Sequence, residues 1–543
     1  MKKHAIIIGS GFGALGSACI LGKAGWKVTV LEKNESVGGR ATIFKVRRKE
    51  VAKIPAGLNA ARGDGEKRTE TYEEYVEGAS EPTTKRGVKA DEFIFDRGPS
   101  WYLMPDVFEH FFSLFDEDIN KILDLKKLSP SYQIFYKDLN QKVSIFSDLK
   151  KDIPTLEAIE AGSGKQLEKY LDQAGYQYEV AKDRFMYKNY DSVRDFLTRE
   201  VATEGRKLSV FKNMDKYVRK YFKTEQLQKI MQYPLVFLGS SPYNTPAIYN
   251  IMSHIDFNMG VFYPQGGIYK ITEALVDVAK KYDVTFNTES DVQKIIVENG
   301  KAVGVKVNGK ILKGDIVISN ADIHHTEQKL LEPEQREYSE KYWQKRTMAP
   351  SALIMYLGVD KQYDSLTHHN LLFSRDWQKN FAEIFDMPQW PDDPSLYICA
   401  PSKTDPSVAP KGMENMFVLV PIASGLTYTE KQLGIYADKI LATIEKEMDL
   451  PDLRKHIVYQ KNFSVKDFKQ RYNSYQGTAL GLAHTLRQTA IFRPNNISKK
   501  VADLYYVGAG TNPGIGMPVT LISAELLYKR IIGDKTSGPL KKI

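Results

Sequence analysis

The sequence predicts an α/β protein in which a parallel-sheet domain is split along the chain and carries an inserted α+β domain. Three segments support this prediction. An apolar strand, a glycine turn and a helix open the chain, an α/β stretch covers 263–322, and a second glycine-rich turn precedes a helix near the C-terminus. Because both terminal segments have the pattern of a parallel strand turning into its helix, we expect the chain to leave the first domain, build a second and return.

The first element is a strand over 5–8, which is followed by a glycine turn and a helix over 14–24. The turn has the pattern Gly9-x-Gly11-x-x-Ala14. Gly9 permits a tight turn, Gly11 lets a pyrophosphate approach the backbone, and Ala14 lets the helix pack on the strand. The helix N-terminus offers unpaired N–H groups to phosphates. The segment therefore predicts a Rossmann-like dinucleotide site, and the alternative is a glycine turn used only for packing.

The next strand, over 28–31, ends at Glu32, and Gly38-Gly39-Arg40 follows soon after. A carboxylate at this strand end can accept hydrogen bonds from a ribose, and it would repel the 2′-phosphate of NADP. Two glycines bring backbone close to a ligand, and Arg40 supplies a fixed cation for a diphosphate. The alternative for this motif is a surface loop with an unpaired arginine.

Near its middle the chain is expected to return to the first domain. A turn over 263–267 precedes a helix over 268–281, and strands follow. Asn299-Gly300 has the composition of a hairpin turn, which predicts an antiparallel meander over 292–312. The run 316–322 then predicts a buried strand with a polar end.

The last element is a strand over 504–507, which leads into Gly508-Ala509-Gly510, a second glycine-rich turn and a helix over 519–531. Glycine-dense backbone suits the face of a flat ring system. The N–H groups at the start of the helix can stabilise negative charge on such a ring.

Composition excludes several classes of protein. Of the 543 residues, 42% are hydrophobic and 26% are charged, unlike disordered chains, collagens or coiled coils. The net charge of +9 is too small to indicate nucleic acid but is compatible with an anionic membrane surface. Two cysteines, Cys19 and Cys399, cannot build a disulfide framework. We therefore expect an intracellular protein without a membrane-spanning helix.

Longer motifs resemble those of bacterial-type phytoene desaturases in the FAD-binding amine-oxidase and carotenoid-desaturase superfamily. The resemblance begins at Glu32-x5-Gly-Gly-Arg40 and continues in Phe95–Pro105, Asn473–Ala479 and Val507–Pro518. Family members often carry histidine at the position of Asn512, so no role is carried over to that residue.

The resemblance implies a split Rossmann-like FAD-binding domain with an inserted α+β substrate domain. We expect FAD to be held without a covalent link, because the FAD motifs contain no suitably placed cysteine or histidine. The resemblance also implies a backbone contact from Val292 to the adenine. The motifs and the resemblance together indicate these FAD-binding residues: Gly9, Gly11, Phe12, Gly13, Ala14, Glu32, Lys33, Gly38, Gly39, Arg40, Val292, Gly508, Ala509, Gly510, Gly516 and Met517. The expected FAD-domain segments are 1–130, 251–340 and 481–543, and the substrate-domain segments are 131–250 and 341–480.

Two segments concern the surface of the protein. The polar stretch over about 45–91 interrupts the resemblance, and we expect a surface loop there, with a small appended hairpin as the alternative. Basic and aromatic residues alternate over Arg206–Lys229, and the apolar run Leu235–Leu238 follows. This pair suits a membrane-interface entrance for substrate. The alternative is an ordinary helix with a solvated basic face.

No metal site is expected. The pairs His324-His325 and His368-His369 have no acidic residue or cysteine at ligand spacing along the chain. Adjacent residues on a strand also point to opposite sides.

The resemblance implies desaturation of a carotenoid precursor such as phytoene, with hydride transfer to flavin N5 and proton loss from the neighbouring carbon. The substrate is an apolar polyene, so we expect a long aromatic tunnel. Asp322 and His254 are the candidates for the proton acceptor. Oxygen or a quinone is the expected electron acceptor, and the expected location is the cytoplasmic face of the cell membrane, with peripheral attachment.

Two other functions stay open at this point. One is a different FAD enzyme on the same scaffold: a carotenoid isomerase, a retinol saturase, a diapocarotenoid oxidase or an amine oxidase. The other is a prenyl-lipid-binding escort protein that needs no flavin, against which the intact glycine motifs argue.

Overall fold

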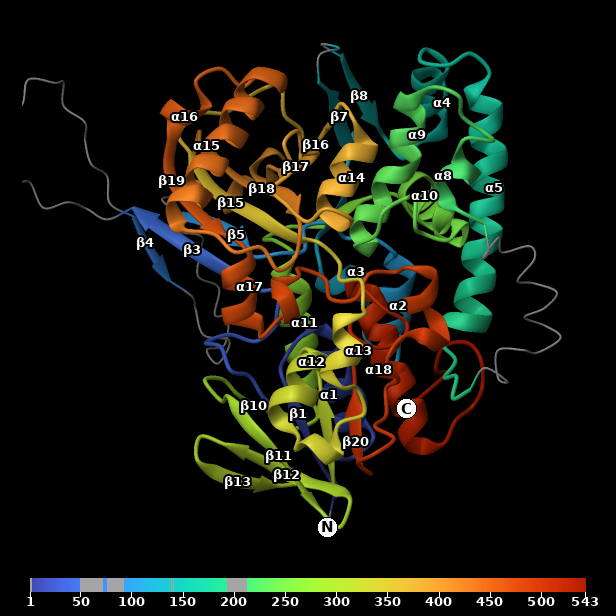
Figure 1. The fold of residues 1–543 in the computed structure, drawn as a ribbon, viewed down its shortest axis with the longest axis vertical. Helices are drawn as coiled ribbons and strands as arrows, with labels where there is room; N and C mark the ends of the chain where they lie inside the picture. Colours follow the sequence, from blue (N-terminus) through green and yellow to red (C-terminus); the bar gives the residue numbers. More distant parts are fainter. Residues whose placement is uncertain (1, 49–71, 76–91, 138, 140, 193–211) are drawn as a thin grey trace, which may run out of the picture.

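The computed structural model describes residues 2–48, 72–75, 92–137, 139, 141–192 and 212–543, and it confirms the predicted α/β class (Figure 1). A five-stranded sheet gathers strands from both ends and the middle of the chain, and all its neighbours pair in parallel. In sheet order the strands are β10 (Thr285–Asn287), β2 (Lys27–Leu31), β1 (His4–Ile8), β14 (Ile316–Ser319) and β20 (Leu504–Tyr506).

The parallel sheet is covered on both faces, which explains why β1 and β14 are continuous apolar runs. On one face, Ala5 and Ile7 share a hydrophobic cluster with three helices: α1 (Phe12–Lys23), α11 (Tyr269–Lys280) and α18 (Met517–Ile532). On the other face, Ile6 and Ile8 pack with the predicted meander of β11 (Val292–Glu298), β12 (Lys301–Val307) and β13 (Lys310–Lys313).

A seven-stranded mixed sheet forms the inserted part of the protein. In sheet order its strands are β19 (Ile457–Phe463), β15 (Ser351–Val359), β18 (Glu414–Ile422), β17 (Leu396–Cys399), β16 (His369–Phe373), β7 (Tyr132–Tyr136) and β8 (Gln141–Ile145). Strands β7 and β8 form the predicted hairpin. Helix α15 (Glu430–Glu447) covers one face of this sheet.

The other face of the seven-stranded sheet packs against a layer of helices and against Trp101, which lies between β5 (Glu92–Asp96) and α2 (Pro105–Ser113). This layer includes α5 (Ser163–Ala181), α8 (Met214–Val218), α9 (Glu225–Gln232) and a short 3₁₀ helix over Tyr233–Leu238. The remaining main helices are α2 (Pro105–Ser113), α3 (Ile119–Ile122), α4 (Leu149–Glu157), α10 (Ile251–His254), α12 (Ile323–His325), α13 (Glu340–Gln344), α14 (Trp377–Phe385), α16 (Leu453–His456) and α17 (Val465–Tyr472). In the described part of the chain, none of the helices combines the length and apolar character that crossing a bilayer requires.

The stretch expected to be a surface loop lies mostly outside the described residues, but strands occur at its edges. Strand β3 (Ile43–Arg48) pairs with both β4 (Tyr72–Tyr75) and β5 (Glu92–Asp96). Glu74 on β4 forms an ion pair with Lys461 of β19. For the residues that are described, the hairpin alternative is therefore the better account.

Candidate functional site

A cavity of about 540 Å³ opens at the carboxyl edge of the parallel sheet and continues into the inserted domain. The segments that follow β1, β2, β14 and β20 all line it. Parallel α/β sheets bind ligands at this edge, because every strand there turns into a loop whose backbone is free to make contacts.

Bare backbone forms the inner wall at this end. A Cβ atom on Gly13 would lie 2.9 Å from the Cα and N atoms of Gly508, and one on Gly39 would lie 3.0 Å from the Cα of Gly11. A Cβ on Gly11 would come within 2.6 Å of Asn320 Oδ1. Larger residues would fill this space, so the wall is shaped for a ligand that needs close contact with the main chain.

Two helix N-termini point at the same cavity. Gly11 caps α1 and Gly516 caps α18, and both line the cavity. The free N–H groups of such ends carry partial positive charge, so both ends favour negative groups on a ligand.

Glu32 is buried at the end of β2 and accepts four hydrogen bonds from protein donors. Its Oε2 accepts from the Ser10 amide at 3.0 Å and the Ser10 hydroxyl at 2.6 Å. Its Oε1 accepts from the Asn34 amide at 2.9 Å and the Asn34 side chain at 2.7 Å. Glu32 therefore lines the cavity and also holds the loops that contain Ser10 and Asn34 in place.

Arg40 is a cation on the cavity wall whose Nε has no hydrogen-bond partner among the described residues. Its guanidinium lies 5.2 Å from the centre of the Tyr472 ring. Burial lowers the pKa of Arg40, and the charges of Tyr472 and Asp322 oppose that shift. An anion on a bound ligand would satisfy this buried donor.

The structure brings nearly all the sequence-predicted residues together. Fifteen of the sixteen line the cavity, and the exception, Ala14, is buried in α1 behind the wall. Asp322 also lines the cavity, but its carboxylate caps α12 by accepting from His325 N and also accepts from Tyr475 N. His254 is not among the lining residues: its ring packs 5.3 Å from Tyr178 and bonds to Asn258.

The far half of the cavity is walled by aromatic side chains, of which only Trp101 and Phe237 fall in segments that the sequence singled out. They come from the segment before α2, the 3₁₀ helix, β16 and α14: Trp101, Tyr233, Phe237, Phe373, Trp377 and Phe381. Val236, Phe237 and Leu238 are part of this wall, while Leu235 is only 1% exposed. Leu235–Leu238, expected to form part of a membrane-interface entrance, therefore faces the cavity and does not offer an exposed apolar surface to lipid.

Two polar networks interrupt this wall. Tyr233 and Tyr132 donate hydrogen bonds to Asp256 Oδ2 at 3.0 and 2.7 Å, and burial raises the pKa of Asp256 to about 7. The Tyr397 hydroxyl lies 2.8 Å from Ser100 Oγ and 2.7 Å from His369 Nδ1. Sequence inspection missed both, since their members are far apart along the chain.

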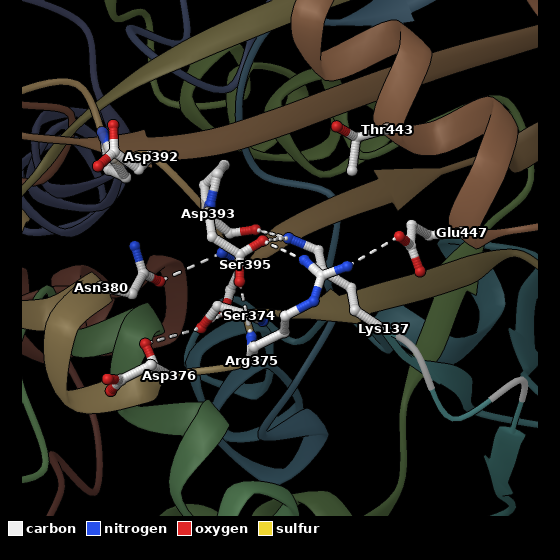
Figure 2. Close-up of polar contacts among 12 residues, drawn as sticks. Lys137, Ser374, Arg375, Asp376, Asn380, Asp392, Asp393, Ser395, Thr443 and Glu447 are labelled. Atoms are coloured by element: carbon white, nitrogen blue, oxygen red, sulfur yellow. Dashed lines mark hydrogen bonds and ion pairs between the residues drawn. The ribbon is translucent and has the colours of Figure 1, made fainter.

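Behind the far end lies an ion-pair network (Figure 2). The Asp393 carboxylate accepts from Lys137 Nζ at 2.7 Å and from Arg375 at 3.0 Å, and Arg375 also pairs with Glu447. Ser395, two residues on, donates its amide to Asn380 Oδ1 at 3.2 Å. Ser395 and Asn380 both line the cavity, so this network anchors its end wall.

The sequence matches the family described as flavin containing amine oxidoreductase over residues 83–526, and a NAD(P)-binding Rossmann-like domain over 7–75. It is 42% identical to the carotenoid 3,4-desaturase of Haloarcula japonica over 97% of this chain and 98% of that protein. The chain belongs to the carotenoid desaturases of the flavin-containing amine oxidoreductase family. It is therefore an FAD-dependent oxidoreductase, and FAD is its cofactor.

Other members of this family are similar over comparable lengths. The zeta-carotene-forming phytoene desaturase of Myxococcus xanthus is 30% identical over 98% of this chain and 94% of its own. A 4,4'-diapophytoene desaturase of Staphylococcus haemolyticus is 31% identical over 98% of this chain and 99% of its own.

Solved structures with low identity share the fold. An oxidoreductase from Methanosarcina mazei aligns with TM-score 0.57 at 17% identity, covering 97% of this chain and 100% of that one. A RAB GDI from Plasmodium falciparum aligns with TM-score 0.51 at 12% identity, covering 99% and 100%. Since both an oxidoreductase and a RAB GDI have this fold, the fold alone does not fix the function.

Proposed function

We propose that this chain introduces double bonds into a carotenoid precursor, and that the single continuous cavity is where FAD and the polyene meet. The observation that carries the proposal is the change of character along that cavity, from glycine backbone at the sheet edge to aromatic side chains in the inserted domain. FAD, when bound, supplies the hydride acceptor at N5. The relatives named above as carotenoid desaturases support the polyene as the other occupant.

At the sheet edge, we assign the FAD contacts to the residues predicted from the motifs. The unpartnered Nε of Arg40 and the two helix N-termini suit a diphosphate, and the glycine wall suits close approach of a ring. Glu32 suits the ribose, and it also orders the Ser10 and Asn34 loops that frame the site.

In the aromatic half, the side chains exclude water and hold the reacting carbon in place. A hydrocarbon offers no polar handle, so positioning supplies most of the rate enhancement. For proton uptake we favour Asp256 over Asp322 and His254. Asp256 does not line the cavity itself, but it bonds to the hydroxyl of Tyr233, which does, and burial raises its pKa to about 7. Asp322 is engaged in capping, and His254 bonds to Asn258 rather than to a lining residue.

A water-insoluble polyene has to be collected from a lipid surface, so we propose peripheral attachment to the cytoplasmic face of the membrane. Electrons would pass on to oxygen or a quinone. Since Leu235–Leu238 lines the cavity, the attachment is assigned to exposed cations alone: Lys216, Lys220 and Lys223 around α8. The more N-terminal basic residues of this stretch, 206–211, lie outside the described residues.

The decisive experiment is product analysis. Purified, FAD-loaded protein is incubated with acyclic carotenoids of increasing unsaturation, beginning with phytoene, in liposomes under air or with a quinone. Products are separated chromatographically and their double bonds counted by absorption and mass. Loss of two hydrogens per turnover is expected. An unchanged mass with a shifted spectrum would indicate isomerisation instead.

A further inference from the structure

Two imidazoles and a thiol meet in the seven-stranded sheet, behind Trp101 and Tyr397 of the cavity wall. Cys399 is the last residue of β17, and its register partner across the antiparallel pair β16–β17 is His369. His368 immediately precedes β16. One ligand atom from each of the three lies within 4.8 Å of the other two, and all three residues are at most 3% exposed.

The two imidazoles are held in fixed orientations. His368 Nδ1 is 2.8 Å from Thr404 Oγ1, and His369 Nδ1 is 2.7 Å from the Tyr397 hydroxyl. The Trp101 ring stacks on His369 with centroids 4.0 Å apart and planes 7° apart. A hydrogen bond to one ring nitrogen is the usual way in which proteins aim the other nitrogen at a metal.

The second ring nitrogen of each histidine, Nε2, has no hydrogen-bond partner among the described residues. Both Nε2 atoms are buried. Buried polar atoms without partners are rare, because each costs roughly 1–3 kcal/mol. Two of them on adjacent histidines, next to a buried cysteine, therefore indicate that the cluster binds a ligand.

We propose that His368, His369 and Cys399 bind a Zn²⁺ ion. Two imidazole nitrogens and one thiolate are a zinc ligand set, whereas calcium and magnesium require oxygen ligands. A small cavity of about 20 Å³ lies on the Cys399 side of the cluster, where Ser100, Tyr263 and Asp96 also line it, and it has room for one water beside the thiol. The Asp96 carboxyl in the same cavity can offset the positive charge that a zinc ion with one thiolate retains.

The site could not be predicted from residue spacing, because the cysteine lies about thirty positions after the histidine pair. His369 and Cys399 are cross-strand partners, so antiparallel pairing supplies the cysteine that local spacing lacked. Because His368 lies just outside the strand, the two histidine rings do not diverge, and their centroids are 4.5 Å apart. The ion would tie β16 to β17 and hold the His369 ring on which the cavity-lining Trp101 stacks.

The test measures metal in full-length, FAD-loaded protein prepared without a histidine tag, grown with zinc and dialysed to remove loosely held metal. Elemental analysis should find about one zinc per chain. X-ray absorption at the zinc edge should show one sulfur near 2.3 Å and nitrogens near 2.0–2.1 Å. Cys399→Ser should lose the sulfur shell and most of the zinc.

Cys19→Ser is the matched control, since Cys19 is also buried but donates to Leu275 O in the FAD domain. It should keep both zinc and sulfur shell. If Cys399→Ser does not fold, as judged by its FAD content, His368→Gln takes its place. The proposal is overturned if parent protein holds no more zinc than the Cys399 or His368 variant, if its zinc has no sulfur neighbour, or if copper is found instead.

Discussion

The two ends of the cavity are built in different ways. At the sheet edge the wall is main chain: glycines from the turns after β1 and β20 approach so closely that even a Cβ would collide. In the inserted domain the wall is side chain, with aromatic rings from β16, α14 and a 3₁₀ helix. A backbone wall follows from short local motifs, whereas an aromatic wall depends on how distant elements pack. If this difference holds, substitutions should disturb the two ends separately.

The largest effect is expected from Gly13→Val. Its side chain would press on the backbone of Gly508, which would lie 2.9 Å from the added Cβ and cannot move like a flexible side chain. Overpacking of this kind costs about 1–3 kcal/mol, so FAD affinity should fall by up to about 100-fold. Fluorescence titration with FAD measures it. Gly434→Ala is the control and should bind FAD as the parent does, since among the described residues no neighbouring atom lies within 4 Å of the added Cβ. Equal affinity in both would show that this contact does not shape the site.

At the other end, Leu371→Trp should separate substrate binding from FAD binding. Leu371 is 7% exposed on β16 and lines the cavity. A larger ring there displaces the polyene, and a displacement of about 1 Å can cost about 100-fold in kcat/KM. FAD content should not change. Ile435→Trp places the same ring at a position that is 61% exposed and serves as the control. Loss of FAD in Leu371→Trp would mean that the two ends are not independent.

Outside the aromatic half, replacing Lys216, Lys220 and Lys223 with Gln should weaken sedimentation with anionic liposomes. Each cation near such a surface contributes about 1 kcal/mol, less as salt increases. The triple variant should therefore bind less tightly at low salt and depend less on salt, with its FAD content unchanged. Binding equal to the parent's across a salt series would remove this surface from the proposal.

Asp256→Asn should change how the free energy of unfolding depends on pH. Burial raises the pKa of Asp256 from its usual 3.8 to about 7, and the charge of Asp152 adds to that. The folded protein then holds this proton more tightly than the unfolded chain does. The contribution of Asp256 to stability is therefore complete below about pH 4 and is lost as pH rises to about 7.

The asparagine variant lacks this titration but keeps an oxygen for Tyr132 and Tyr233. The stability of the parent relative to the variant should fall by on the order of 1 kcal/mol per pH unit across that interval. Urea unfolding at a series of pH values measures it. Parallel pH profiles would show that Asp256 ionises normally.

The smallest effect is expected from Lys137→Met behind the end wall. The Lys137 side chain is 0% exposed and pairs with Asp393, which is 32% exposed and also bonded to Arg375. Because Asp393 keeps a cationic partner, the loss should be about 1–2 kcal/mol rather than that of an isolated buried charge. Lys455→Met removes an exposed pair with Asp452 and should leave the urea midpoint unchanged. If the two variants unfold alike, the network in Figure 2 adds no stability of its own.

Local sequence patterns, with the family resemblance for Val292, were sufficient to predict the sheet-edge half of the cavity. Short apolar runs, glycines at the turns after them and an acid at the end of β2 specified the parallel sheet and its edge, and fifteen of sixteen predicted residues line the cavity there. They could be predicted because each turn is coded within a few residues, and parallel strands bring their carboxyl ends to one edge.

The environments in the inserted domain depend instead on packing between distant elements. Leu235–Leu238 has the apolar composition of a run that contacts lipid, but in the folded protein it is packed against the cavity. Asp256 became a shared acceptor for Tyr132 and Tyr233, and Cys399 became the neighbour of the histidine pair. In each case the partners come from separate elements. The physical reason is that burial and cross-strand pairing set these environments, and neither leaves a periodic signal in the local sequence.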